Sequence, residues 1–165
     1  MKKYYLLVAI IVFGLMVQLC SFTALAANDE KNIAEVLNSF HQAAADAQAE
    51  PYFNLMSQDA IFLGTDASER WSKEEFKAFV DPYFLKGTGW LYIPTERNIS
   101  LVKQGQVAFF DELLLSETYG TCRGSGVLIK TNQGWKISQY NLSIPMPNGI
   151  AKALVKQIKS FEPSK

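Results

Sequence analysis

The chain has 165 residues, a length that suits one compact domain, and its 16 basic and 16 acidic side chains give a formal net charge of zero. Because there is no basic excess, the composition argues against nucleic acid as a partner. A single histidine, His41, and the lack of a cysteine cluster argue against a metal site, and we expect neither a metal nor another cofactor.

The first 26 residues have the pattern of a secretory signal peptide. Two lysines near the start precede an apolar run over residues 4–19, and small residues follow as far as Ala26. A basic start, an apolar middle and a small-residue cleavage site are the three parts of such a signal, so we expect cleavage near Ala26. The chain therefore divides into a signal peptide, residues 1–26, and a single domain, residues 27–165.

Two other interpretations of this leader are weaker. The apolar run is short for a membrane-spanning helix, which needs roughly 20 residues. Lipid attachment at Cys20 is disfavoured because Leu19 stands where a lipoprotein signal has Gly, Ala or Ser. Cleavage removes two lysines and leaves 14 basic against 16 acidic side chains. We expect the mature domain to be periplasmic or secreted, to have no membrane partner, and to keep only Cys122, as a small buried apolar residue.

The N-terminal half is predicted to be mainly helical. From Asp29 onward, apolar residues recur at spacings of three and four, which predicts an amphipathic helix of about 20 residues. Pro51 opens a short second helix, residues 51–58, and a brief strand follows over residues 60–64. The capping-box sequence SKEE begins a third helix at about Lys73. This third helix is expected to bury its apolar residues Phe76, Phe79 and Val80.

From Trp90 onward, strand-like runs alternate with turn sequences. The runs cover residues 90–102, 107–115, 121–130 and 135–144. The final segment places Ile150, Leu154, Ile158 and Phe161 on one side of a C-terminal amphipathic helix, which we expect to pack on this domain or on a second copy of it. Helices first and antiparallel strands afterwards predict an α+β domain with helices on one face of the sheet.

Residues 107–115 form a strand that is apolar on both faces, although Asp111 and Glu112 lie side by side within it. Successive strand residues point to opposite faces, so one carboxylate faces each side. Helices would cover one face, and we expect a homodimer through the sheet to cover the other. In the next strand, Gly124 and Gly126 indicate strong curvature, and a sheet bent around helices leaves a cavity at its wide end.

Asp111, Glu112 and Arg123 are candidate catalytic residues. Their structural alternative is a buried or interfacial ion pair. In the catalytic interpretation, one acid sits in a dry pocket with a raised pKa and removes a proton next to a carbonyl, while Arg123 or Tyr140 stabilises the oxyanion. A five-residue loop over 116–120 would place Arg123 on the face of Asp111, and an even-numbered loop would place it with Glu112.

Three further regions supply candidate ligand-binding residues, each with a structural alternative such as capping or backbone hydrogen bonding. One is the edge of the first helix, and another is the polar loop before the third helix. The last is the final strand, where strict alternation puts Trp135 and Ile137 on the same face as three polar residues and so predicts a pocket with an apolar floor and a polar mouth. The candidates are His41, Asp66, Glu69, Trp71, Gln139, Tyr140, Asn141 and Ser143.

Four segments together resemble the SnoaL-like branch of the nuclear transport factor 2 (NTF2) superfamily, in an exported bacterial form. They are "YFNLMSQDAIFLGTDASERWSKEEF", "VAFFDELL", "RGSGVLIK" and "WKISQYNLSIPMPN", in this order over nearly all of residues 27–165. The resemblance implies a cone in which a long helix and two shorter ones nest in a curved, mainly antiparallel sheet, with a pocket between them and frequent dimerisation through the outer face.

The resemblance leaves the function open. Such proteins include ketosteroid isomerases, polyketide cyclases, dehydratases and domains that only bind or dimerise. No motif transfers their catalytic residues to this chain. A related kinase association domain has two histidines in its last strand where this chain has Gln139 and Asn141. We rank a non-catalytic domain that binds a small, partly apolar ligand first, ahead of an acid–base isomerase, cyclase or dehydratase and of a structural dimerisation module.

Overall fold

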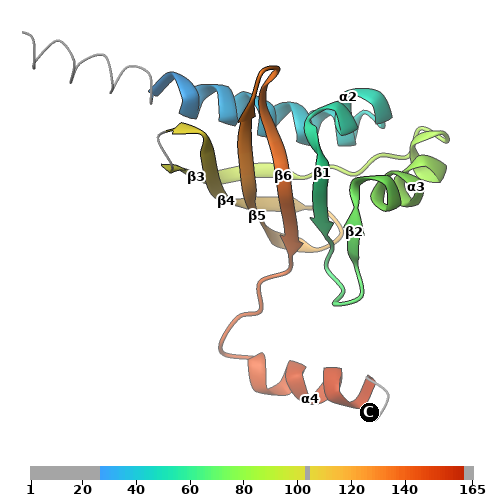
Figure 1. Cartoon of the computed structure of the whole chain (residues 1–165). Coiled ribbons are helices and arrows are strands. Elements are labelled where there is room, and N and C mark those ends of the chain that lie inside the picture. The colour runs from blue at the N-terminus through green and yellow to red at the C-terminus, as the bar shows by residue number, and fades with distance from the viewer. Residues whose placement is uncertain (1–26, 103–104, 162–165) are drawn as a thin grey trace, which may run out of the picture.

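A computed structural model describes residues 27–102 and 105–161, and the predicted signal peptide, residues 1–26, lies outside these ranges. Helices lie against one side of a curved six-stranded sheet, and a last helix follows the final strand (Figure 1). This arrangement confirms the predicted α+β class. Within the described ranges, no helix has the length and apolar character needed to cross a bilayer.

The N-terminal helix is described over residues 27–45, and two shorter helices follow it, α2 (Ala49–Asn54) and α3 (Lys73–Phe84). α3 begins at the predicted capping box. The Ser72 hydroxyl accepts from the amide of Glu75, and the Glu75 carboxylate accepts from the amide of Ser72 at 2.8 Å. α2 ends earlier than expected, because the chain enters a strand at Met56, whose buried side chain packs in the core.

The sheet has the strand order β2-β1-β6-β5-β4-β3. All neighbours are antiparallel except β1 and β6, which are parallel. The strands are β1 (Met56–Leu63), β2 (Arg70–Ser72), β3 (Ile93–Val102), β4 (Val107–Ser116), β5 (Gly120–Thr131) and β6 (Gly134–Ser143). The long antiparallel strands β3 to β6 form the wall of the cone, and the helices fill it.

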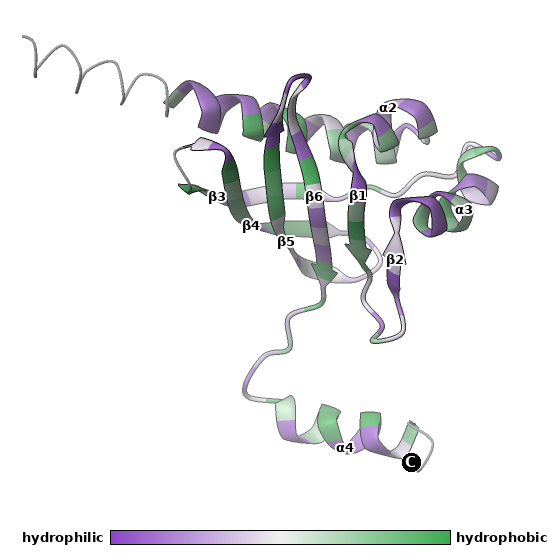
Figure 2. Cartoon of the chain, viewed as in Figure 1, coloured by the Kyte–Doolittle hydropathy of each residue, from purple (hydrophilic) through white to green (hydrophobic). Residues whose placement is uncertain are grey.

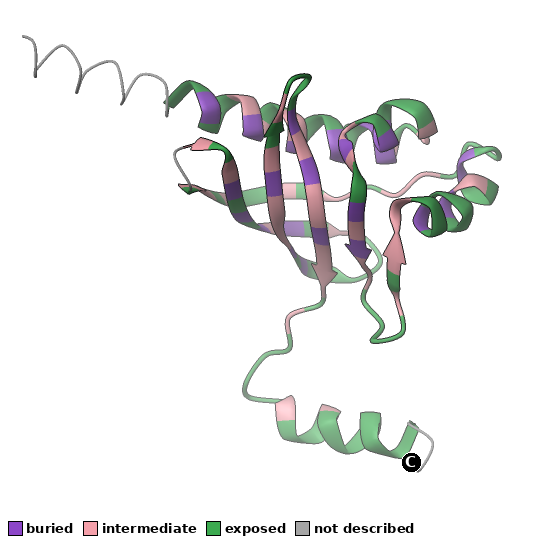
Figure 3. Cartoon of the chain, in the orientation of Figure 1, coloured by how far each residue is buried: buried purple, intermediate pink, exposed green. Residues whose placement is uncertain are grey.

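The alternation within β4 decides where each acid points. Ala108, Phe110, Glu112 and Leu114 are buried against the helices, while Phe109, Asp111 and Leu115 are exposed on the outer face. Figure 3 shows alternating burial along the strands, whereas Figure 2 shows continuous apolar stretches in the same strands. Glu112 therefore faces the interior of the cone, and Asp111 faces outward.

The β4–β5 hairpin has the odd parity, the first of the two alternatives considered for Arg123, although Ser116 and Gly120 also pair and the loop is shorter than five residues. Leu115 pairs with Thr121 and Leu113 pairs with Arg123. This parity places Arg123 on the outer face, the same face as Asp111. Within the described residues, however, no ion pair joins Arg123 to either acid, and Asp111 instead accepts a hydrogen bond from Asn98 Nδ2 at 3.1 Å.

A bulge in β6 overturns the predicted alternation of that strand. Val127 pairs with Gln139 but the next residue, Leu128, pairs with Ile137, so one extra residue is inserted. Trp135 and Ile137 face the core before the bulge, and Tyr140 faces it afterwards. The expectation that one face carries both the apolar and the polar residues is therefore wrong. The polar residues Gln139, Asn141 and Ser143 pair with outer-face residues of β5 and lie on the outer face.

The C-terminal helix α4 (Ala151–Phe161) forms as predicted, but it does not pack on its own domain. It has no buried residue, and it stands away from the sheet in Figures 1 and 3. The apolar residues Val155, Ile158 and Phe161 of α4 are exposed, as is Ile150, which immediately precedes the helix. Packing on a second copy remains a prediction.

Gly126 lies beside the bulge at a position with no room for a side chain. A Cβ atom here would collide with the carbonyl oxygen of Gln139 and approach Phe110 to 3.0 Å. We expect Gly126→Ala to lower the free energy of unfolding by about 1–3 kcal/mol through overpacking. Gly149→Ala is the matched control, because nothing lies within 4 Å of the new methyl group. Urea unfolding measures both variants. Equal stabilities would contradict the close packing of Gly126 against Gln139 and Phe110.

Candidate functional site

Glu112 is the centre of a buried polar cluster that we call the Glu112 cluster, formed with His41, Arg97 and Tyr140. His41 Nε2 lies 2.7 Å from Glu112 Oε1, and the Tyr140 hydroxyl donates to the same oxygen at 3.1 Å. Arg97 Nε donates to Oε2 at 2.7 Å, and its Nη2 makes an ion-pair contact with Oε2 at 2.6 Å. The cluster joins the N-terminal helix to strands β3, β4 and β6.

Two local features of the sheet make room for the Glu112 cluster. Arg97 on β3 pairs directly with Glu112 on β4, so the two side chains leave the sheet at the same point. On the other side of Glu112, β5 presents Gly124, where a Cβ atom would collide with the Tyr140 hydroxyl and lie 2.9 Å from Glu112 Oε1. The glycine that indicated curvature in the sequence therefore also leaves space for the carboxylate and the phenol.

The partners of Glu112 keep it ionised. Burial alone would raise the pKa of Glu112, but the hydrogen bond from His41 and the charges of His41 and Arg97 outweigh burial and hold this pKa below its usual value. Burial and the adjacent Glu112 charge raise the pKa of Tyr140 well above its usual value, so the phenol stays protonated and donates. A carboxylate with a lowered pKa is a weak base, contrary to the raised pKa of the catalytic interpretation.

The candidate catalytic residues are not brought together. Glu112 is inside the cone with 1% of its surface exposed, whereas Asp111 and Arg123 are on the outer face. The ionic partner of Glu112 is Arg97, which the sequence interpretation missed. The sequence did contain a sign of this role. Arg97 lies two residues before Ile99 and therefore on the same face of the strand, where it is a charged residue among apolar ones.

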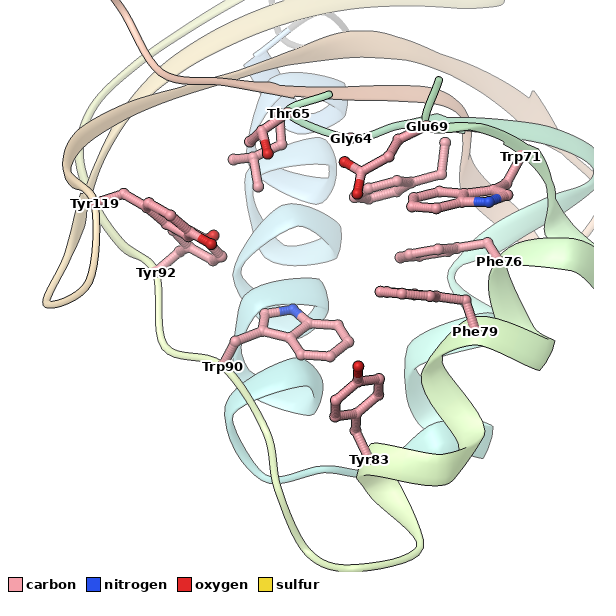
Figure 4. Close-up of a pocket in the computed structure, with 12 residues that line it drawn as sticks. Gly64, Thr65, Glu69, Trp71, Phe76, Phe79, Tyr83, Trp90, Tyr92 and Tyr119 are labelled. Atoms are coloured by element: carbon pink, nitrogen blue, oxygen red, sulfur yellow. The ribbon is translucent and has the colours of Figure 1, made fainter. Parts of the chain in front are cut away.

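A second, open site lies at the wide end of the cone, and we call it the aromatic pocket. It encloses about 300 Å³ between α3, the β1–β2 loop, the segment before β3 and the β4–β5 turn (Figure 4). Aromatic rings dominate the described lining. The lining residues are Phe62, Gly64, Thr65, Glu69, Trp71, Phe76, Phe79, Tyr83, Trp90, Tyr92, Tyr119 and Leu142.

One wall of the aromatic pocket is a stack of rings from α3 and β2. Phe76, Phe79 and Tyr83 follow one another at spacings of three and four residues, which places them on one side of the helix. Trp71 stacks on Phe79, with ring centroids 4.9 Å apart and planes 19° apart. Phe79 was expected to be buried, but it is 42% exposed and lines the pocket.

The opposite wall carries Trp90, Tyr92 and Tyr119, which Figure 4 shows across the pocket from the α3 rings. Burial, with the nearby Cys122 and Tyr119, raises the pKa of Tyr92 to about 12, so its hydroxyl is neutral at physiological pH. These three residues were missed by sequence reasoning. They come from a loop and a turn, and their meeting depends on the fold of the whole sheet.

Two of the predicted ligand-binding residues, Glu69 and Trp71, line the aromatic pocket. Glu69 accepts a hydrogen bond from the Asp66 amide at 3.0 Å, and its carboxylate points into the pocket in Figure 4. Asp66 itself is exposed and accepts hydrogen bonds from both the amide and the hydroxyl of Ser68, so it shapes the loop. This is the loop hydrogen-bonding role that the sequence offered as the alternative to ligand binding.

His41 borders a separate hollow of about 260 Å³ beside the start of β3. A narrow cavity of about 20 Å³, bordered by His41 and Tyr140, adjoins both this hollow and the aromatic pocket, because Tyr92 lines all three. No group of three His, Cys, Asp or Glu residues suited to a metal occurs in the described ranges. The side chains open to a ligand are therefore those of the aromatic pocket, whereas the Glu112 cluster is buried behind them.

Comparisons with known proteins identify the family and the fold. A family model described as a SnoaL-like domain matches residues 33–147. An NTF2-like protein of unknown function from Pseudomonas putida KT2440 superposes with a TM-score of 0.61 at 14% identity, over 74% of this chain and 90% of that chain. A candidate dehydratase of the NTF2-like family from Streptomyces avermitilis gives 0.63 at 14% identity, over 74% and 99%.

An NTF2-like protein with a cystatin-like fold from Novosphingobium aromaticivorans gives a TM-score of 0.60 at 14% identity, over 79% of this chain and 91% of that chain. At such low identities, these structures show the fold alone. No curated protein matches the chain in sequence.

Replacement of Glu112 tests what the cluster contributes to stability. Glu112→Gln leaves the largely buried Arg97 without its counter-charge, and we expect the free energy of unfolding to fall by about 3 kcal/mol. Asp111→Asn, one residue away on the exposed face, is expected to change it by no more than about 0.5 kcal/mol. Urea unfolding at neutral pH compares the two variants. Similar losses of unfolding free energy would contradict the conclusion that Glu112 is the inner, ion-paired acid.

The pH dependence of stability provides an independent test of the same cluster. Because the pKa of folded Glu112 is below its unfolded value of about 4.3, the stabilisation is present above that pH and is lost as pH falls through the folded pKa. We expect Glu112→Gln to flatten the loss of stability as the pH falls below about 4.5, and an unchanged slope would contradict the role of Glu112. Asp29, whose pKa is also lowered, preserves part of the slope in the variant.

Proposed function

The chain belongs to the SnoaL-like domain family of the NTF2-like superfamily, and we propose that it binds a small, partly apolar ligand in the aromatic pocket without transforming it. The observation that carries this proposal is the open, aromatic-lined pocket of about 300 Å³ at the mouth of the cone. Ligand sites are concave and mostly apolar, with a few polar groups that set orientation, and their volumes begin at about 300 Å³. Thr65, Glu69 and the tyrosine hydroxyls are such groups here.

The pocket suits a compact ligand with a flat apolar body. Burying about 150 Å² of apolar ligand surface contributes roughly 4 kcal/mol before the entropic cost of association. The rings on both walls supply such a surface, and their packing against one another holds several of them in place. Phe76, for example, is buried and stacks on Phe62 with centroids 3.8 Å apart. A pre-formed apolar surface reduces the ordering cost of binding.

We further propose that residues 1–26 direct export, that cleavage near Ala26 leaves a periplasmic or secreted domain, and that this domain forms a homodimer through the outer sheet face. The basic, apolar and small-residue parts of the leader support export. Phe109 and Leu115, which are exposed on the outer face, support an apolar contact between two copies.

An acid–base isomerase, cyclase or dehydratase is the second candidate. It is favoured by the proximity of His41, Glu112 and Tyr140 behind the aromatic pocket, and one structural neighbour is a candidate dehydratase. Three observations place it second. Glu112 has a lowered pKa, its side chain is fully covered, and both of its oxygens already have protein partners. A purely structural dimer module is the third candidate, and it predicts no ligand.

Binding of N-phenyl-1-naphthylamine, a neutral fluorescent probe, tests the proposal. We expect one probe per domain to bind, and Phe79→Ala to weaken its affinity about tenfold or more, because the substitution removes an exposed ring from the α3 wall of the aromatic pocket. Phe109→Ala is the matched control, since Phe109 is 50% exposed but lies on the outer face. Fluorescence titration measures both. Loss of binding only in Phe109→Ala would move the site to the outer face, and no binding would favour the structural module.

A further inference from the structure

The charge of the aromatic pocket indicates what kind of ligand it takes. Among the described residues that line the pocket, Glu69 alone carries a charge, and no lysine or arginine is among them. The other polar groups of the lining include the hydroxyls of Thr65 and of three tyrosines. Figure 4 shows the Glu69 carboxylate directed into the space between the two aromatic walls. The pocket therefore has one negative charge in surroundings that are otherwise largely apolar.

The structure holds this carboxylate in position. The Asp66 amide donates to Glu69 Oε2, and the Glu69 side chain lies so close over Gly64 that a Cβ atom at Gly64 would collide with it. In addition, the Glu69 carbonyl accepts from the Gly64 amide at 2.9 Å, which closes the loop. Glu69 Oε1 accepts no hydrogen bond from a described residue. One oxygen is thus used to orient the group, and the other is available to a ligand.

A ligand that fills the pocket must displace water from this carboxylate. An ionised carboxylate only accepts hydrogen bonds, and covering it without a donor is costly. An ammonium group supplies both the donor and the opposite charge, and such charge-assisted hydrogen bonds are about twice as strong as neutral ones. An anionic ligand would place a second negative charge beside Glu69, with no basic lining residue to offset it.

We propose that the ligand is an organic ammonium compound: a primary or secondary amine, protonated at physiological pH, on a flat apolar body. The body lies between the α3 ring stack and Trp90, and the ammonium group donates to Glu69 Oε1. This inference rests on the proposed ligand-binding function and adds the sign of the ligand's charge. It also assigns to Glu69 the recognition of that charge.

Three compounds that share one ring system but differ in charge test the inference. They are 1-naphthylmethylamine, 1-naphthylmethanol and 1-naphthoate, and isothermal titration calorimetry at pH 7 and low salt measures their binding to the unmodified domain. We expect the amine to bind about tenfold more tightly than the alcohol, and the carboxylate to bind more weakly than both. Raising the salt concentration should weaken the amine alone, because only its binding depends on an attraction between charges.

Glu69→Gln is expected to remove the advantage of the amine and to leave the affinity for the alcohol within about threefold. Glu96→Gln is the matched control, because Glu96 lies on the exposed side of β3 and should change neither affinity. The charge series on the unmodified domain remains decisive even if a variant folds poorly.

The outcomes separate this inference from the proposed function. Equal binding of amine and alcohol, or tightest binding of the carboxylate, would overturn the charge assignment while the pocket remains a ligand site. An equal loss of amine and alcohol binding in Glu69→Gln would overturn the role of Glu69 in charge recognition and make it a structural residue of the loop. Failure of all three compounds to bind the unmodified domain would overturn both the inference and the ligand-binding function.

Discussion

The buried carboxylate of Glu112 is the interaction on which the rest of this structure depends. An isolated charge in the interior of a protein costs several kcal/mol, so Glu112 is tolerated only because Arg97, His41 and Tyr140 surround it. These partners belong to three different elements. Arg97 in turn donates to Asn38 on the N-terminal helix at 2.8 Å. The cluster thus ties the helix to the sheet at one defined position, in a core whose other contacts are mainly apolar and non-directional.

The same cluster influences where free volume remains inside the cone. Its polar groups largely pair with one another, and the ring of Phe40 packs on Tyr140 with centroids 5.0 Å apart, so only a narrow cavity of about 20 Å³ remains beside them. Free volume remains at the wide end, where α3 and the loops around it bring aromatic side chains together. The cone therefore holds one buried carboxylate, Glu112, in its interior and one further carboxylate, Glu69, in the lining of the aromatic pocket.

Much of the fold, and less of the site, could be predicted from the sequence. The capping box at Ser72, the apolar spacing of the helices and the alternation in β4 are local patterns, and each formed the predicted element. The odd loop parity that pairs Leu113 with Arg123 was one of two alternatives left open by the sequence, and the strand register decides it. The prediction of strict alternation in β6 was wrong. The bulge in this strand arises from its pairing with β5 and has no distinct local sequence pattern. Glu69 and Trp71 were identified as polar-loop candidates, but the tyrosines and tryptophan opposite them were not.

The sequence by itself determined the type and order of the elements and the fact that Asp111 and Glu112 face opposite sides, because helix and strand periods act over a few residues. Only the tertiary structure decided that Glu112 is the inner acid, that Arg97 is its partner and that Glu69 faces Trp90 and Tyr92 across a pocket. Those outcomes depend on strand register, on one bulge and on which side of the sheet the helices cover. Each of them is set by contacts between residues that are far apart in the chain.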